Sequence, residues 1–187
     1  MPSLYQLKPG FQALLRPLVA LLAAAGITAN QLTVATCLAS MLLGAGLMWE
    51  RRGWILLPIF LIARMALNAM DGMLAREHGQ KSKLGALLNE LTDVISDAAL
   101  TLPIAILPGW NPLWVAGAIF FAALAEMAGM LGLTIGSTRR YDGPFGKSDR
   151  ALALGWPISA WFIEAAPPAW IALCCATIVQ RVRRAIG

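Results

Sequence analysis

Apolar residues along this chain fall into six long stretches that are separated by short polar segments. With their flanks, these stretches are long enough to cross a hydrocarbon layer of ~30 Å as helices, although the last two are short by themselves. The pattern therefore predicts an all-α polytopic membrane protein with six transmembrane helices. The predicted spans are Gln31–Met48, Trp54–Ala75, Leu84–Leu107, Leu113–Ile135, Ala151–Ile163 and Ala169–Val179.

An amphipathic segment, Pro9–Ala25, precedes the first span. We expect it to form an N-terminal juxtamembrane helix that lies on the membrane, with Lys8 and Arg16 facing the headgroups. The alternative is a helix packed across the end of the bundle. Composition agrees with a membrane protein, because 58% of the 187 residues are hydrophobic and 13% are charged, about half the charged fraction of a soluble domain. Without repeats or linkers, residues 1–187 are predicted to form a single domain.

The basic residues predict the orientation of the chain. Of the 15 lysines and arginines, all but Arg51, Arg52 and Arg64 fall on the side of the N-terminus, as expected for cytoplasmic segments. Six tryptophans bracket the opposite turns, at the interface that indole rings favour. We therefore expect both termini to be cytoplasmic, in a bacterial inner (plasma) membrane. The net charge of +5 is explained by this orientation, so no nucleic-acid partner is expected.

Ionisable groups interrupt the second and third spans, where each costs about 3 kcal/mol or more and usually faces a cavity. Residues three or four apart share a helix face, and the two spans are joined by a short turn. The two polar faces should therefore meet near the cytoplasmic surface, where their oxygens suit Mg2+ or Mn2+. The residues concerned are Asn68, Asp71, Asn89 and Asp93, with Gly72 and Gly85 allowing close approach.

A purely structural role is the alternative for these polar residues, as hydrogen bonds and ion pairs between helices. It is the preferred interpretation for Arg64 and Asp97, which lie deeper, roughly 18 Å from the cytoplasmic helix ends, and are predicted to form an ion pair. Glu126, in the fourth span, also requires a partner. We expect a structural hydrogen bond there, with contact to lipid or acceptor as the alternative.

The polar residues follow a known spacing. The chain reads Asn68-x2-Asp71-Gly72-x2-Ala75-Arg76, then eight residues, then Gly85-x3-Asn89-x3-Asp93. This string resembles the signature of the CDP-alcohol phosphatidyltransferases, which has aspartate where this chain has Asn68 and Asn89. The segment that opens the first span, Gly26–Thr33, also resembles the family. With two negative charges instead of four, the site should bind metal more weakly. One metal instead of two, charge supplied by Glu90 or Asp97, and loss of chemistry all remain open.

The resemblance implies an enzyme of phospholipid biosynthesis that works at the cytoplasmic face of the membrane. It would transfer a phosphatidyl (phospho-alcohol) group from a CDP-lipid such as CDP-diacylglycerol to the hydroxyl of a small polar alcohol or phospho-alcohol, releasing CMP. One or two Mg2+ or Mn2+ ions and a homodimer are implied. So are residue roles: Asp93 as catalytic base; Asn68, Asp71, Asn89 and Asp93 as metal ligands; and Asp71, Gly72, Ala75, Arg76 and Gly85 at the CDP site.

A second basic site is expected in the loop before the fifth span. Lys147 and Arg150 would bind the acceptor's phosphate or a lipid headgroup, because ammonium and guanidinium groups pair well with phosphate. The alternative is a loop that is basic only because it is cytoplasmic, which suits Arg139 and Arg140. Two other functions compete with the enzyme. One is a catalytically degenerate relative that binds CDP-lipid or nucleotide without turnover, and the other is a small transporter.

Overall fold

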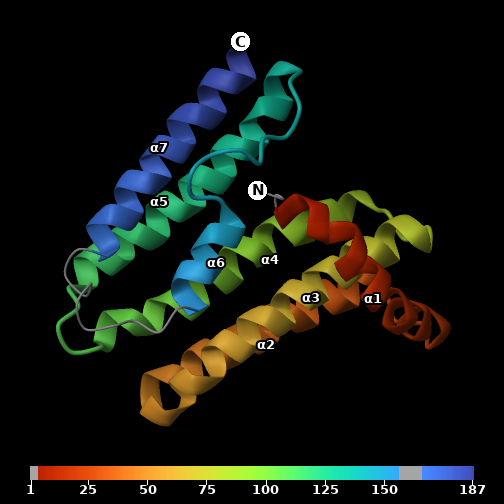
Figure 1. Ribbon diagram of the computed structural model, residues 1–187, viewed down its shortest axis with the longest axis horizontal. Helices are drawn as coiled ribbons and strands as arrows, with labels where there is room; N and C mark the ends of the chain where they lie inside the picture. The colour runs from red at the N-terminus through yellow and green to blue at the C-terminus, as the bar shows by residue number, and fades with distance from the viewer. Residues whose placement is uncertain (1–3, 156–165) are drawn as a thin grey trace. The chain divides into compact units, whose positions relative to one another are not determined.

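The structure is a computed structural model that describes residues 4–155 and 166–187 (Figure 1). These residues form helices and contain no β-strand, so the prediction of an all-α protein is confirmed for them. The α-helices are α1 (Leu4–Ala24), α2 (Ala29–Trp49), α3 (Leu56–Glu77), α4 (Lys83–Thr101), α5 (Pro112–Leu131), α6 (Lys147–Gly155) and α7 (Ala166–Ile186). Three 3-10 helices connect them: η1 (Arg51–Ile55), η2 (Leu102–Ile106) and η3 (Gly132–Ile135).

The chain divides into two compact units, each built from two stretches of sequence. The first unit contains the residues up to Leu42 together with Ile59–Ser96. The second contains Leu43–Pro58 and the chain from Asp97 onward. The helices α2, α3 and α4 therefore contribute residues to both units. That residues 1–187 act as one domain stays a prediction.

Local sequence signals explain where α1 ends and α2 begins. Gly26 has a φ of 75°, and the amides of Gly26 and Ile27 donate to the carbonyls of Ala23 and Leu22. This is a Schellman termination, which favours glycine because its φ is positive. Thr28 and Gln31 then form a capping box, since each side chain accepts a hydrogen bond from the other's backbone amide.

In the first unit, α1 packs on the C-terminal half of α3. The shared core consists of Leu15 and Val19 from α1, Ala29 from α2, and Met70, Met73 and Leu74 from α3. An exposed bidentate ion pair between Arg16 and Glu77 joins the same two helices, with nitrogen–oxygen distances of 3.0 and 3.1 Å. The amphipathic segment is therefore a helix, as predicted. It contacts the C-terminal end of α3, just before the turn that leads to α4.

In the second unit, α5 lies alongside α7 (Figure 1). Ala122, Phe145 and Cys174 form a core between them, and the rings of Phe145 and Trp170 meet edge to face. The third span was predicted to run to Leu107, but the α-helix ends at Thr101 and continues as the 3-10 helix η2. Pro103 explains the change, because proline has no amide to donate to the carbonyl of Ala99.

Among the described residues, three helices are long and apolar enough to cross a membrane: Ala29–Trp49, Gly53–Glu77 and Pro112–Ile135. The predicted count of six spans is not confirmed. The third predicted span carries too many polar residues, and α7 ends in a run of arginines. The fifth predicted span, Ala151–Ile163, lies mostly outside the described residues. Large apolar side chains such as Leu42, Ile59 and Leu113 are exposed on the helices, as expected for surfaces that face lipid.

Candidate functional site

The polar faces of α3 and α4 meet within the first unit. The side-chain amide nitrogen of Asn68 lies 3.1 Å from Oδ1 of Asp93. A carboxylate accepts hydrogen bonds, so Asn68 must present its NH2 group to Asp93. The structure thus brings together one residue from each half of the signature, which the short turn between the spans led us to expect.

Arg64 lies one helical turn from Asn68 and contacts the same acidic residue. Its Nη2 lies 3.7 Å from Oδ1 of Asp93 and donates to the backbone carbonyl of Asp93 at 3.3 Å. The side chain is buried, with 5% of its surface exposed. The guanidinium therefore places a positive charge beside the residue that the resemblance makes the catalytic base.

Asp71 is buried, and its carboxylate is held from α2. The hydroxyl of Thr33 lies 2.8 Å from Oδ2 of Asp71 and 2.9 Å from the carbonyl of Ala29. A hydroxyl has one proton, and an ionised carboxylate is the stronger of these two acceptors. Thr33 therefore orients Asp71. It lay within the resembling segment at the start of the first span but was not singled out as a site residue.

The residues expected at the CDP site lie around the ends of α3 and α4. A Cβ atom on Gly72 would lie 2.9 Å from Nη1 of Arg76, so glycine leaves room for that guanidinium. A Cβ atom on Gly85 would lie 2.6 Å from Oδ1 of Asn30, so glycine lets the start of α4 approach α2. Ala75 packs against the core of the first unit. These contacts explain the small residues in the signature by packing.

The donors fit a divalent cation only in part. Asp71, Asp93 and Asn89 carry oxygens of the kind that Mg2+ and Mn2+ prefer, and Asn89 lies one turn before Asp93 on α4. Asn68, however, offers its NH2 group to Asp93. Within the described part of the chain, no group of three or more His, Cys, Asp or Glu side chains is placed to hold a metal. The residues therefore fit one cation better than two.

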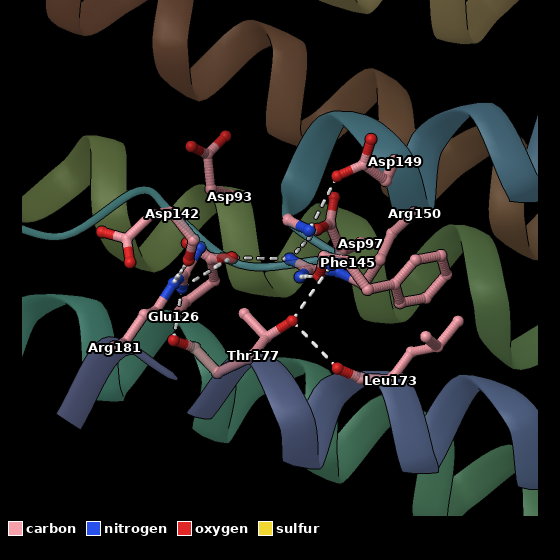
Figure 2. Close-up of polar contacts among 12 residues, drawn as sticks. Asp93, Asp97, Glu126, Asp142, Phe145, Asp149, Arg150, Leu173, Thr177 and Arg181 are labelled. Carbon is pink, nitrogen blue, oxygen red and sulfur yellow. Dashed lines mark hydrogen bonds and ion pairs between the residues drawn. The ribbon is translucent and has the colours of Figure 1, made fainter. Parts of the chain in front are cut away.

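Several ionisable residues of the second unit form a network around Glu126 (Figure 2). Oε1 of Glu126 lies 2.8 Å from Nη2 of Arg150 and 3.5 Å from Nη1 of Arg181, and Oε2 lies 4.0 Å from Arg139. Nη2 of Arg150 also lies 3.5 Å from Oδ2 of Asp97. The expectation that Glu126 has a structural partner is therefore confirmed, and the partners are arginines. The predicted ion pair of Arg64 with Asp97 stays a prediction, because each of them has another partner within its own unit.

Arg150 links the two carboxylates Glu126 and Asp97 in this network. Its side chain is 3% exposed, and it also donates to the carbonyl of Phe145. Burial opposes the charged form of Arg150, but the nearby Glu126 and Asp97 outweigh it and raise the pKa of Arg150 above its ordinary value. The predicted phosphate-binding guanidinium is thus engaged by carboxylates of the protein itself.

The loop before α6 is anchored on α7 by residues that the sequence did not single out. Thr177 accepts a hydrogen bond from the amide of Phe145, and Arg181 donates to the carbonyl of Asp142 (Figure 2). Asp149 accepts one from the amide of Gly146, next to Lys147 at the start of α6. Thr177 and Arg181 are four residues apart on one helix face, and this spacing in an apolar segment was the available signal.

Comparison with known proteins decides the family. The family model for CDP-alcohol phosphatidyltransferases matches residues 26–180. The chain belongs to this family. The match includes both halves of the signature and, of the network around Glu126, every residue except Arg181. The resemblance inferred from Asp71, Gly72 and their neighbours is therefore confirmed, and membership supports a transferase that acts in phospholipid synthesis.

The chain is also similar in sequence to two curated proteins. The chain is 52% identical over 155 residues to the inner membrane protein YnbA of Escherichia coli strain K12, a match that covers 82% of this chain and 77% of YnbA. It is 36% identical over 126 residues to an archaetidylinositol phosphate synthase of Pyrococcus horikoshii, which covers 64% of this chain and 66% of that protein.

Proposed function

We propose that this protein transfers a phosphatidyl group from a CDP-activated lipid, such as CDP-diacylglycerol, to the hydroxyl of a small polar alcohol or phospho-alcohol. One observation carries the proposal. This chain belongs to the family and retains Asp71 and Asp93 at the signature spacing, and a hydrogen bond from Asn68 to Asp93 joins the two signature halves. The name of the Pyrococcus relative, a synthase of an inositol phosphate lipid, is consistent with a phosphorylated acceptor.

The chemistry is a displacement at the β-phosphorus of the donor. The acceptor's hydroxyl oxygen bonds to that phosphorus, the bond to the bridging oxygen breaks, and CMP leaves with that oxygen. In this proposal Asp93 receives the hydroxyl proton. Asp71 and Asn89 would hold a divalent cation, whose charge would stabilise the pyrophosphate and the leaving group. Gly72, Ala75, Arg76 and Gly85 line the CDP site. We propose Mg2+ or Mn2+ as the cation.

The location follows from the same proposal. Three strongly apolar helices and a relative named as an inner membrane protein support a bacterial inner membrane. The distribution of lysine and arginine supports cytoplasmic termini and a cytoplasmic site. The acceptor's phosphate would bind at Lys147 and Arg150, where it must compete with Glu126 for Arg150. We also propose a homodimer, for which the family resemblance is the support.

The test is release of CMP by purified protein in lipid nanodiscs. CDP-diacylglycerol, Mn2+ or Mg2+ and a panel of alcohols and phospho-alcohols would be supplied, and CMP measured by chromatography. We expect CMP with at least one acceptor, and Asp93→Asn should lower its rate about 100-fold or more, since general acid–base catalysis contributes 10²–10⁴-fold. Glu50→Gln, which changes an exposed carboxylate, is the matched control.

A degenerate relative is the second candidate, favoured by the asparagines at positions 68 and 89. In that case the wild-type protein would bind CDP but would release no CMP with any acceptor. Unchanged CMP release by Asp93→Asn would instead remove Asp93 from the mechanism.

A further inference from the structure

Arg64 and Asn68 act on a single oxygen of the signature. Both side chains come from α3, one turn apart, and both contact Oδ1 of Asp93. Because Asn68 donates to this oxygen, it stabilises the ionised carboxylate from the position where the family signature has another carboxylate. Arg64 is buried beside it and brings a guanidinium charge. The chain itself, through the guanidinium of Arg64, therefore places a positive charge beside Asp93.

The charges of the site limit how many cations it can hold. Four aspartates of the family signature balance two divalent cations. Here the four acidic positions of the signature retain two negative charges, on Asp71 and Asp93, and Arg64 adds one positive charge beside Asp93. Counted on these groups alone, two divalent cations would leave three uncompensated positive charges. Charges in a site of low dielectric repel one another strongly. One cation with Arg64 leaves a single positive charge, which the pyrophosphate of a donor can balance.

We propose that Arg64 takes the place of one of the two cations, so that the site binds a single divalent ion at Asp71. This inference rests on the proposed function, because it assigns the signature residues to a metal site. In it, Arg64 is a positioning residue for Asp93: it holds the carboxylate and supplies fixed charge there. Asn68 and Asn89 are consistent with this role of Arg64, because asparagine at these positions removes the two negative charges that a second ion would require.

Binding of Mn2+ tests this proposal without relying on turnover. Purified protein in nanodiscs would be titrated with Mn2+, in the presence of CDP, and free Mn2+ followed by electron paramagnetic resonance. We expect one bound ion per chain for the wild type and for Arg64→Lys, which keeps the charge. Arg64→Met should bind its ion at least about tenfold more tightly, because a repelling charge has been removed. Arg183→Met, which changes an exposed arginine of α7, should bind as the wild type does.

A triple variant completes the test where Arg64→Met alone does not fold. Removing Arg64 leaves Asp93 without its charge partner, so the single variant should lose stability. Arg64→Met combined with Asn68→Asp and Asn89→Asp restores four carboxylates and should bind two ions. No ion or two ions on the wild type, or one ion on the triple variant, would overturn the proposal.

Parallel measurement of CMP release separates this inference from the proposed function. CMP release by a wild-type chain with two bound ions would reject the role of Arg64 and leave the transferase function standing. One bound ion without CMP release for any acceptor would reject the transferase function and leave the charge replacement by Arg64 standing.

Discussion

At the scale of single residues, the site depends on which groups donate and which accept. Aspartate and asparagine differ at one atom, yet at position 68 this difference replaces repulsion of Asp93 by a hydrogen bond. The spacing of the signature predicted which residues meet. It did not predict that Arg64 reaches Asp93 or that Thr33 reaches Asp71, because these contacts depend on how the helices rotate and pack. A sequence spacing does not contain that information.

The contact of Thr33 with Asp71 leads to a prediction at this scale. Thr33→Val keeps the shape of the side chain but removes the hydroxyl, which leaves a buried carboxylate without this donor at a cost of about 1–3 kcal/mol. We expect CMP release to fall about tenfold or more and the apparent affinity for Mn2+ to change, both measured on purified protein. Thr33→Ser keeps the hydroxyl and should retain most of the activity. Equal losses for valine and serine would mean that Thr33 acts through packing alone.

At the scale of helices, the boundaries show what an apolar pattern can predict. The span Trp54–Ala75 was predicted within two residues of each end of α3, because length and hydropathy define it. The span Leu84–Leu107 was predicted as one helix, but Pro103 changes its last part into η2. Next to this break, a Cβ atom on Gly44 of α2 would overlap the carbonyl of Ala99. Close packing of α2 on α4 in the second unit therefore requires glycine at position 44.

Two glycines of α2 test this packing. Gly44→Ala should lower the free energy of unfolding by about 1–3 kcal/mol, the usual range for overpacking a well-packed contact. Gly46→Ala, two residues further along the same helix, has no atom within 4 Å of the new Cβ and should be neutral or stabilise the helix by up to about 1 kcal/mol. Thermal unfolding in one detergent would measure both. Similar unfolding midpoints for the two variants would contradict the contact at Ala99.

At the scale of the whole molecule, the family and the all-α class followed from the sequence, whereas the number of membrane spans did not. The signature around Asp71 predicted the family, and the family model confirmed it. The six-span count was predicted from apolar stretches, but amphipathic helices such as α4 and α7 carry too many polar residues for hydropathy to settle their place in a membrane. The network around Glu126 was also missed in part, because Arg181 lies far along the chain from its partners.

Orientation is the testable prediction at this scale. His78 is exposed between α3 and α4, and Pro108 is exposed between η2 and α5. With the positive-inside distribution of lysine and arginine, His78→Cys should react with a membrane-impermeant maleimide only from the cytoplasmic side. Pro108→Cys should react only from the opposite side. Inverted and right-side-out vesicles would be compared, with the unsubstituted chain as the background, because Cys37 and Cys174 are buried but Cys175 is only partly buried. Labelling of both positions from one side would contradict the predicted orientation.

The oxygen of Asp93 that Arg64 and Asn68 share also has an evolutionary consequence. Changing Asn68 alone to aspartate sets two carboxylates against each other, and changing Arg64 alone strips Asp93 of its counter-charge. Neither single step is neutral, so a lineage that has acquired this pair has no easy route back to the four-aspartate form. Among descendants of the same ancestor, positions 64 and 68 should therefore covary, and a chain that has regained aspartate at 68 should have lost arginine at 64.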